Sequence, residues 1–172
     1  MSYIVIMIVF DASTLILLAK AELLEKFLEA SEIEAVVPRE VAREACEVKE
    51  SFDALLIKRL IDEKKIRVEV LKDRALFEKL RRALRLGAGE AEAIAMAVAK
   101  RARIVATDDR NAINACKLAR VPFTSAVAVL VRMYEKRAIG KDEALMNLAT
   151  LEREGRYKKS IIAEARARLE VG

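Results

Sequence analysis

Acidic side chains occupy four places where the sequence predicts the end of a strand or the beginning of a helix. Asp11 directly follows an apolar run over residues 4–10, and Asp108 and Asp109 directly follow a shorter one. The remaining acids are Glu40, Glu44, Glu90 and Glu92. Carboxylate oxygens are the ligands that Mg²⁺ and Mn²⁺ prefer, so these positions suggest a site for one or two divalent cations.

The acids that follow strands exceed what simple helix capping requires. Asp11 is not needed as a cap, because Ser13 or Thr14 can cap the helix that follows. Asp108 and Asp109 are two adjacent acids where one cap would suffice. A functional role is therefore favoured for these strand-end carboxylates.

The acids within helices have a structural explanation beside the functional one. Glu40 and Glu44 share a helix face, where like charges cost about 0.2–0.5 kcal/mol unless something compensates them. Glu90 and Glu92 stand in a first helical turn, where the helix dipole favours anions. Doubled acids at three positions leave open which member of each pair is a ligand.

The composition excludes several kinds of catalysis. The chain has no His, which rules out a Ser-His-Asp triad, a Cys-His pair and every His-based zinc site. Cys46 and Cys116 stand far apart with no Cys-x-x-Cys pair, and we expect both to be reduced, buried thiols. Metal-dependent phosphodiester hydrolysis needs no His, because metal-bound water supplies the nucleophile.

Charge and hydropathy indicate a folded protein with an anionic partner. The chain has 172 residues, of which 54% are hydrophobic and 34% charged, enough for a core of its own. Its net charge of +5 suits nucleic acid. The apolar segment 3–19 has Asp11 at its centre and no basic residues before it, so we expect a cytoplasmic protein without membrane contact. Candidate phosphate-binding residues near the acids are Arg81, Arg82, Arg85 and Arg110.

Alternating elements predict an α/β fold, a doubly wound and mostly parallel sheet with helices on both faces. Predicted strands cover residues 4–10, 33–37, 66–71, 104–107 and 121–124. Predicted helices cover residues 15–30 with a break near Lys20, 38–48, 52–63, 73–86, 90–101, 111–119, 126–136, 141–151 and 160–169. We expect one domain over residues 1–136 and a helical C-terminal extension over 137–172. Ligands of such sheets bind beyond the carboxyl ends of the strands, where the acids fall.

Four segments together resemble the PIN-domain nucleases, including the VapC-type toxins. The resemblance covers roughly residues 3–136. Its motifs are an apolar strand followed by Asp-x-Ser at residues 9–16, Pro-x-x-Val-x-x-Glu at 38–44, Gly-Glu-Ala-Glu-Ala at 89–93, and Ala-Thr-x-Asp at 106–109. Many relatives have Asp where Glu90 stands. The resemblance implies a doubly wound parallel sheet and Mg²⁺- or Mn²⁺-dependent ribonuclease activity.

The same resemblance implies roles for individual residues. The primary metal ligands would be Asp11, Glu44, Glu90 and Asp109. Glu92 and Asp108 would be additional ligands or outer partners, with Ser13 and Thr107 supporting Asp11 and Asp109 by hydrogen bonds. Implied partners are RNA, a protein antitoxin and a second copy of the chain in a homodimer.

The sequence therefore predicts a metal-dependent endoribonuclease, with a toxin of a toxin–antitoxin pair as its biological setting. Two alternatives remain open. A haloacid-dehalogenase-like phosphatase also begins with a strand-end Asp, but that class usually has a second Asp where this chain has Ser13. A non-catalytic nucleic-acid-binding or scaffold protein could use the same fold.

Overall fold

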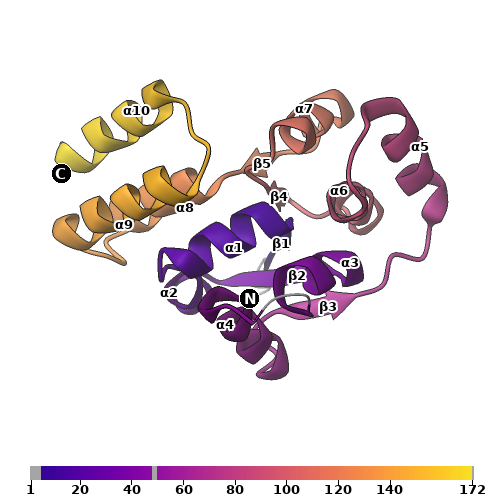
Figure 1. Ribbon diagram of the computed structural model, residues 1–172, viewed down its shortest axis with the longest axis horizontal. Coiled ribbons are helices and arrows are strands. Elements are labelled where there is room, and N and C mark those ends of the chain that lie inside the picture. Colours follow the sequence, from indigo (N-terminus) through magenta and orange to yellow (C-terminus); the bar gives the residue numbers. More distant parts are fainter. Residues whose placement is uncertain (1–4, 48–49, 172) are drawn as a thin grey trace.

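The computed structural model describes residues 5–47 and 50–171, which form a parallel sheet flanked by helices (Figure 1). The strand order is β3-β2-β1-β4-β5, and every neighbouring pair is parallel. The strands are β1 (Ile6–Phe10), β2 (Ile33–Pro38), β3 (Arg67–Glu69), β4 (Ile104–Ala106) and β5 (Phe123–Thr124). The predicted α/β class with a parallel sheet is confirmed.

Helices connect the strands and make up the C-terminal region. They are α1 (Ala12–Lys20), α2 (Leu24–Ala30), α3 (Arg39–Ala42), the π-helical turn η1 (Arg43–Glu47), α4 (Phe52–Asp62), α5 (Arg74–Leu84), α6 (Ala88–Lys100), α7 (Arg110–Ala119), α8 (Ala126–Glu135), α9 (Lys141–Glu154) and α10 (Lys159–Glu170). No helix of the described residues is long and apolar enough to cross a membrane.

Most predicted boundaries agree with the structure, and the differences have local causes. The break expected near Lys20 separates α1 from α2. The strand expected over 66–71 pairs only over Arg67–Glu69, because β3 lies at the edge of the sheet and has a single neighbour, β2. The expected strand start at Ile4 and the expected helix end at Val48 lie outside the described residues.

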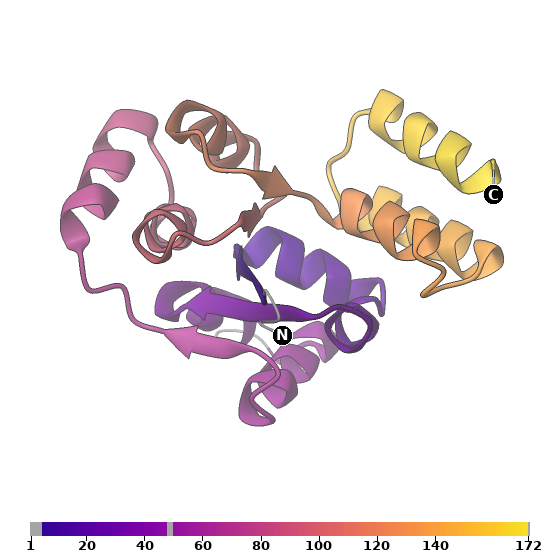
Figure 2. The same ribbon diagram turned by 180° about the vertical axis from the view of Figure 1, so that it is seen from behind.

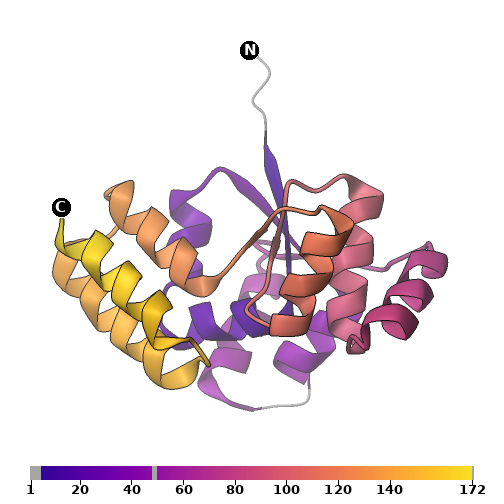
Figure 3. The ribbon, with the colours of Figure 1, turned by 90° about the horizontal axis from the view of Figure 1, so that it is seen from above.

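Helices bury both faces of the sheet, as the view in Figure 3 shows. Within β1, Val9 belongs to a cluster formed with α5, α6 and α7, whereas Ile8 and Phe10 belong to the cluster on the other face. The side chains of a strand alternate between the two faces of a sheet. A strand covered on both faces must therefore be apolar throughout, which explains the uninterrupted apolar run before Asp11.

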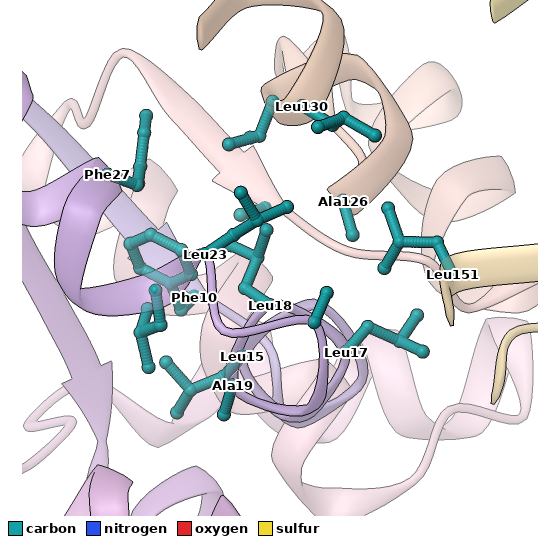
Figure 4. Packing of buried hydrophobic residues seen from close by; sticks show 14 of the residues in the cluster. Phe10, Leu15, Leu17, Leu18, Ala19, Leu23, Phe27, Ala126, Leu130 and Leu151 are labelled. Atoms are coloured by element: carbon teal, nitrogen blue, oxygen red, sulfur yellow. The ribbon is translucent and has the colours of Figure 1, made fainter. Parts of the chain in front are cut away.

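The larger cluster joins the C-terminal helices to the first strand and helix. Figure 4 shows Phe10 and Leu15 packed near residues of α2 and α8, and the ring of Phe10 meets that of Phe27 edge-on at 6.4 Å between centroids. Leu151 of α9 and Leu169 of α10 are fully buried in the same cluster. Seen from behind, α9 and α10 lie beside α8 (Figure 2). The described part of the predicted extension, residues 137–171, thus shares its core with the sheet.

The strand order places the carboxyl ends of β1 and β4 side by side, and the strand-end acids follow these two strands. From β1 the chain moves outward through β2 to β3, then crosses to the other side of β1 to form β4 and β5. The connections after β1 and β4 therefore leave toward opposite faces of the sheet, α1 into one core cluster and α7 into the other. Open α/β sheets bind their ligands beyond the carboxyl ends of strands that diverge in this way. Asp11 follows β1, and Thr107, Asp108 and Asp109 follow β4.

Candidate active site

Asp11 lies at the centre of the candidate site and is almost completely buried. Its carboxylate accepts hydrogen bonds from the Ala12 backbone N–H at 2.7 Å, the Ser13 hydroxyl at 3.0 Å and the Thr107 hydroxyl at 2.8 Å. Burial raises the pKa of Asp11, these hydrogen bonds lower it, and the charge of Asp109 raises it further. Asp11 is thus held in one orientation by groups from the first turn of α1 and from the residue that follows β4.

Asp11 also caps α1, which corrects one expectation from the sequence. Ser13 and Thr14 were expected to cap this helix, but both lie inside its first turn, and Asp11 is the N-cap residue. The physical reason is that a carboxylate at the end of β1 already reaches the first free N–H of the helix. The hydroxyl of Ser13 is therefore free to bond the carboxylate instead.

Glu44, and not Glu40, faces the buried side of its helical segment. Burial raises the pKa of Glu44, and the charges of Asp11 and Glu40 raise it further, while a hydrogen bond from the Gly89 N–H lowers it. Glu40 instead pairs with Arg43 on the exposed side. Like charges four residues apart are therefore compensated by a basic neighbour.

Glu90 lies at the beginning of α6, beside the other three acids. Its carboxylate accepts a hydrogen bond from the Gly87 backbone N–H at 2.9 Å. Burial raises the pKa of Glu90, the Gly87 bond lowers it, and the charges of Asp109, Asp11 and Glu44 raise it further. The helix was expected to begin at Glu90, but it begins at Ala88, because Gly87 acts as the N-cap and Glu90 bonds back to it.

Asp109 completes the group from the end of β4. Its side chain caps α7 by accepting from the Ala112 N–H at 2.9 Å, and its own N–H donates to the Thr107 hydroxyl at 3.2 Å. Thr107 thus bonds the carboxylate of Asp11 and the backbone of Asp109 together. We refer to Asp11, Glu44, Glu90 and Asp109 as the acidic cluster.

Glu92 and Asp108, the predicted additional ligands, have other partners. The buried carboxylate of Glu92 accepts from the Glu40 N–H at 3.0 Å and from Arg74 at 2.6 Å. Asp108 accepts from the Thr14 hydroxyl at 2.5 Å and the Ala126 N–H at 3.0 Å. Neither carboxylate is among the charges that raise the pKa values of Asp11, Glu44 and Glu90. As placed, both help to hold neighbouring segments in position.

The carboxylate oxygens of the acidic cluster are suitable ligands for a hard divalent cation, although the side chains do not stand at coordinating distances from one common point. Among the described residues, no three His, Cys, Asp or Glu side chains stand in a coordinating arrangement. Three of the four acids nevertheless have pKa values raised by other members of the cluster. Such uncompensated repulsion is what a cation would relieve, and oxygen-only donors suit Mg²⁺ or Mn²⁺.

Gly89 belongs to the candidate site, and the sequence analysis did not single it out. A Cβ atom at Gly89 would lie 2.8 Å from both carboxylate oxygens of Glu44. The sequence indicated only a break in the helical pattern over residues 87–89, whereas Gly89 lies inside α6. A glycine within the first turn of a helix is the signal that could have been used, because it often marks a close approach by another group.

The predicted phosphate-binding arginines lie on the exposed surface near the beginning of α6. Arg81 and Arg82 are in the last turn of α5, Arg85 ends that helix, and Arg110 follows Asp109. Within the described part of the chain, these four make no ion pair. Unpaired guanidinium groups remain free to contact an anionic partner.

Comparison with known families identifies the class of protein. A family model described as a PIN domain matches residues 7–170. The chain therefore belongs to the PIN-domain family, and the match extends beyond the residues that resemble the family in sequence, through α9 and into α10. PIN domains are generally nucleases and typically use divalent metal ions. No curated protein and no solved structure matches the chain.

Proposed function

We propose that this protein is a Mg²⁺- or Mn²⁺-dependent endoribonuclease that hydrolyses RNA phosphodiester bonds. The observation that carries the proposal is the acidic cluster, in which carboxylates from four separate segments meet near the carboxyl ends of β1 and β4, and three of them have pKa values raised by charges of other members. Such a group is stable when a cation neutralises it. Family membership supports nuclease chemistry at this place.

Each residue of the site has a defined task in this proposal. The four carboxylates of the acidic cluster would hold the cation, which, when bound, activates water and stabilises the leaving oxygen. Ser13 and Thr107 fix the orientation of Asp11 through their hydroxyl groups. Gly89 leaves space for the carboxylate of Glu44. Arg81, Arg82, Arg85 and Arg110 would contact phosphates of the RNA.

The proposal also includes the biological setting expected from the sequence. The enzyme would act in the cytoplasm as the toxin of a toxin–antitoxin pair, restrained by a protein antitoxin, and would form a homodimer. The match to a PIN domain gives no support to the phosphatase alternative. A non-catalytic PIN-fold protein would retain the fold without the activity, and the following experiment distinguishes it.

The direct test is cleavage of mixed RNA by wild type and by Asp11→Asn, each with and without Mn²⁺. We expect wild type to cleave only with the metal and the variant to be inactive, with an unchanged circular dichroism spectrum. Asp73→Asn is the matched control, because Asp73 also caps a helix, by accepting from the Ala75 N–H, but lies outside the acidic cluster. Equal cleavage by Asp11→Asn would refute the proposed role. No cleavage by metal-loaded wild type would favour the non-catalytic alternative.

A further inference from the structure

A tyrosine of the C-terminal region reaches the strand end that carries the candidate site. Tyr157 lies between α9 and α10, and its hydroxyl donates a hydrogen bond to Asp108. The other carboxylate oxygen of Asp108 accepts from Thr14 of α1 and from the Ala126 N–H of α8. One carboxylate therefore joins four segments of the fold.

The position of the Tyr157 ring depends on a glycine two residues before it. A Cβ atom at Gly155 would lie 2.5 Å from Cε2 of Tyr157 and 2.8 Å from the Leu151 carbonyl oxygen. The φ angle of Gly155 is −93°, so its backbone conformation is open to any residue. Glycine is needed at 155 for space alone, because the Tyr157 ring and the Leu151 carbonyl together leave no room for a side chain.

Asp108 stands between two residues that face the acidic cluster. Thr107 donates to Asp11, and Asp109 belongs to the cluster itself. The N–H of Asp108 donates to the Ser13 hydroxyl at 2.9 Å, so both its backbone and its side chain are held. A shift of Asp108 would turn its two neighbours away from Asp11.

We propose that Tyr157 is a positioning residue, which holds Asp108 so that Thr107 and Asp109 keep their orientation toward Asp11. The C-terminal region thereby helps to hold the site in place through Tyr157, although it contributes no group to the acidic cluster. The effect on the turn at residues 107–109 follows from the structure alone. Its consequence for catalysis rests on the proposed function.

The first measurement concerns the turn and needs no activity. Tyr157→Phe removes the hydroxyl and keeps the ring, and Tyr134→Phe on α8 is the matched control, since the Tyr134 hydroxyl makes no hydrogen bond within residues 5–47 and 50–171. We expect the backbone amides of residues 107–109 to exchange with deuterium roughly tenfold faster in Tyr157→Phe, because a hydrogen bond to the partly buried carboxylate of Asp108 is lost. Unchanged exchange at these amides would overturn the proposal.

A second variant keeps the test decisive if Tyr157→Phe folds poorly. Gly155→Ala retains the hydroxyl, but its methyl group meets both the Tyr157 ring and the Leu151 carbonyl at the end of α9. It should therefore displace the ring and accelerate exchange at the same amides, together with a local effect at the end of α9. Faster exchange spread evenly over all helices in both variants would indicate general destabilisation and would also overturn the proposal.

The second measurement connects the turn to the reaction. In RNA cleavage, Tyr157→Phe should require roughly tenfold more Mn²⁺ for half-maximal rate, with the KM for RNA unchanged at saturating metal. A higher KM with an unchanged Mn²⁺ requirement would contradict a positioning role. If wild type neither cleaves RNA nor binds Mn²⁺, the proposed function fails, while the exchange measurement still decides whether Tyr157 holds the turn.

Discussion

Replacing Gly89 by Ala should separate the stability of the fold from the function of the site. Gly89 lies in the first turn of α6, and the added methyl group would stand 2.8 Å from both carboxylate oxygens of Glu44. Contacts this short do not persist, so one side must move. The obstructing atoms are the far end of a flexible side chain, so we expect Glu44 to swing away while the helix stays in place.

The two effects of Gly89→Ala have opposite signs. Alanine is favoured over glycine within a helix by up to about 1 kcal/mol, which for a chain of this size raises Tm by about 2–4 °C. Displacing one carboxylate from the acidic cluster should weaken Mn²⁺ binding at least about tenfold, the lower end of the effect of mutating groups around a metal. The variant should therefore be as stable as wild type or more stable, and yet a poorer metal binder.

Gly87→Ala provides the matched control for this prediction. A Cβ atom at Gly87 would lie 3.6 Å from the nearest atom of Glu90, which is an ordinary contact. Calorimetric titration with Mn²⁺ and thermal melting of both variants give the two quantities. Unweakened Mn²⁺ binding by Gly89→Ala would refute the role of Glu44 as a metal ligand. A large loss of stability in this variant would refute the expectation that the Glu44 side chain moves aside to accommodate the methyl group.

Two further predictions concern stability. The folded-state pKa of Glu44 is raised above its ordinary 4.5, so the folded protein holds this proton more tightly than the unfolded chain, and its contribution to stability falls as pH rises through the folded pKa. Without metal, Glu44→Gln should therefore match the free energy of unfolding of wild type at about pH 3. At about pH 7 it should exceed that of wild type by at most about 1 kcal/mol, since water screens a half-buried group. Urea unfolding at both pH values measures this difference, and an advantage at the lower pH only would contradict it. Arg120 ends α7 with a φ of 55°. This left-handed conformation costs most residues about 1 kcal/mol or more relative to glycine. In thermal melting, Arg120→Gly should therefore raise Tm by about 2–4 °C, whereas Arg120→Ala should not.

The positions of the strand-end acids could be predicted from the sequence because they follow from chain topology. An uninterrupted apolar run before Asp11 indicates a strand buried on both faces. Parallel strands then place Asp11 and Asp109 at one edge of the sheet, whatever the details of packing. The same local signals located β1, β4 and most helix boundaries.

The contacts between distant segments could not be predicted in the same way. Whether Glu40 or Glu44 faces the cluster depends on the neighbouring Arg43 and on the gap left by Gly89 in another helix. One partner of the Asp108 carboxylate is Tyr157, 49 positions away, which the packing of α9 and α10 brings there. No periodicity or local motif records such long-range pairings.

A crystal soaked in Mn²⁺ tests the central claim most directly, because manganese is located by its anomalous scattering. We expect an anomalous peak between the carboxylates of Asp11, Glu44, Glu90 and Asp109, and no peak there in Asp11→Asn. Manganese bound elsewhere, with these four carboxylates left apart, would contradict it.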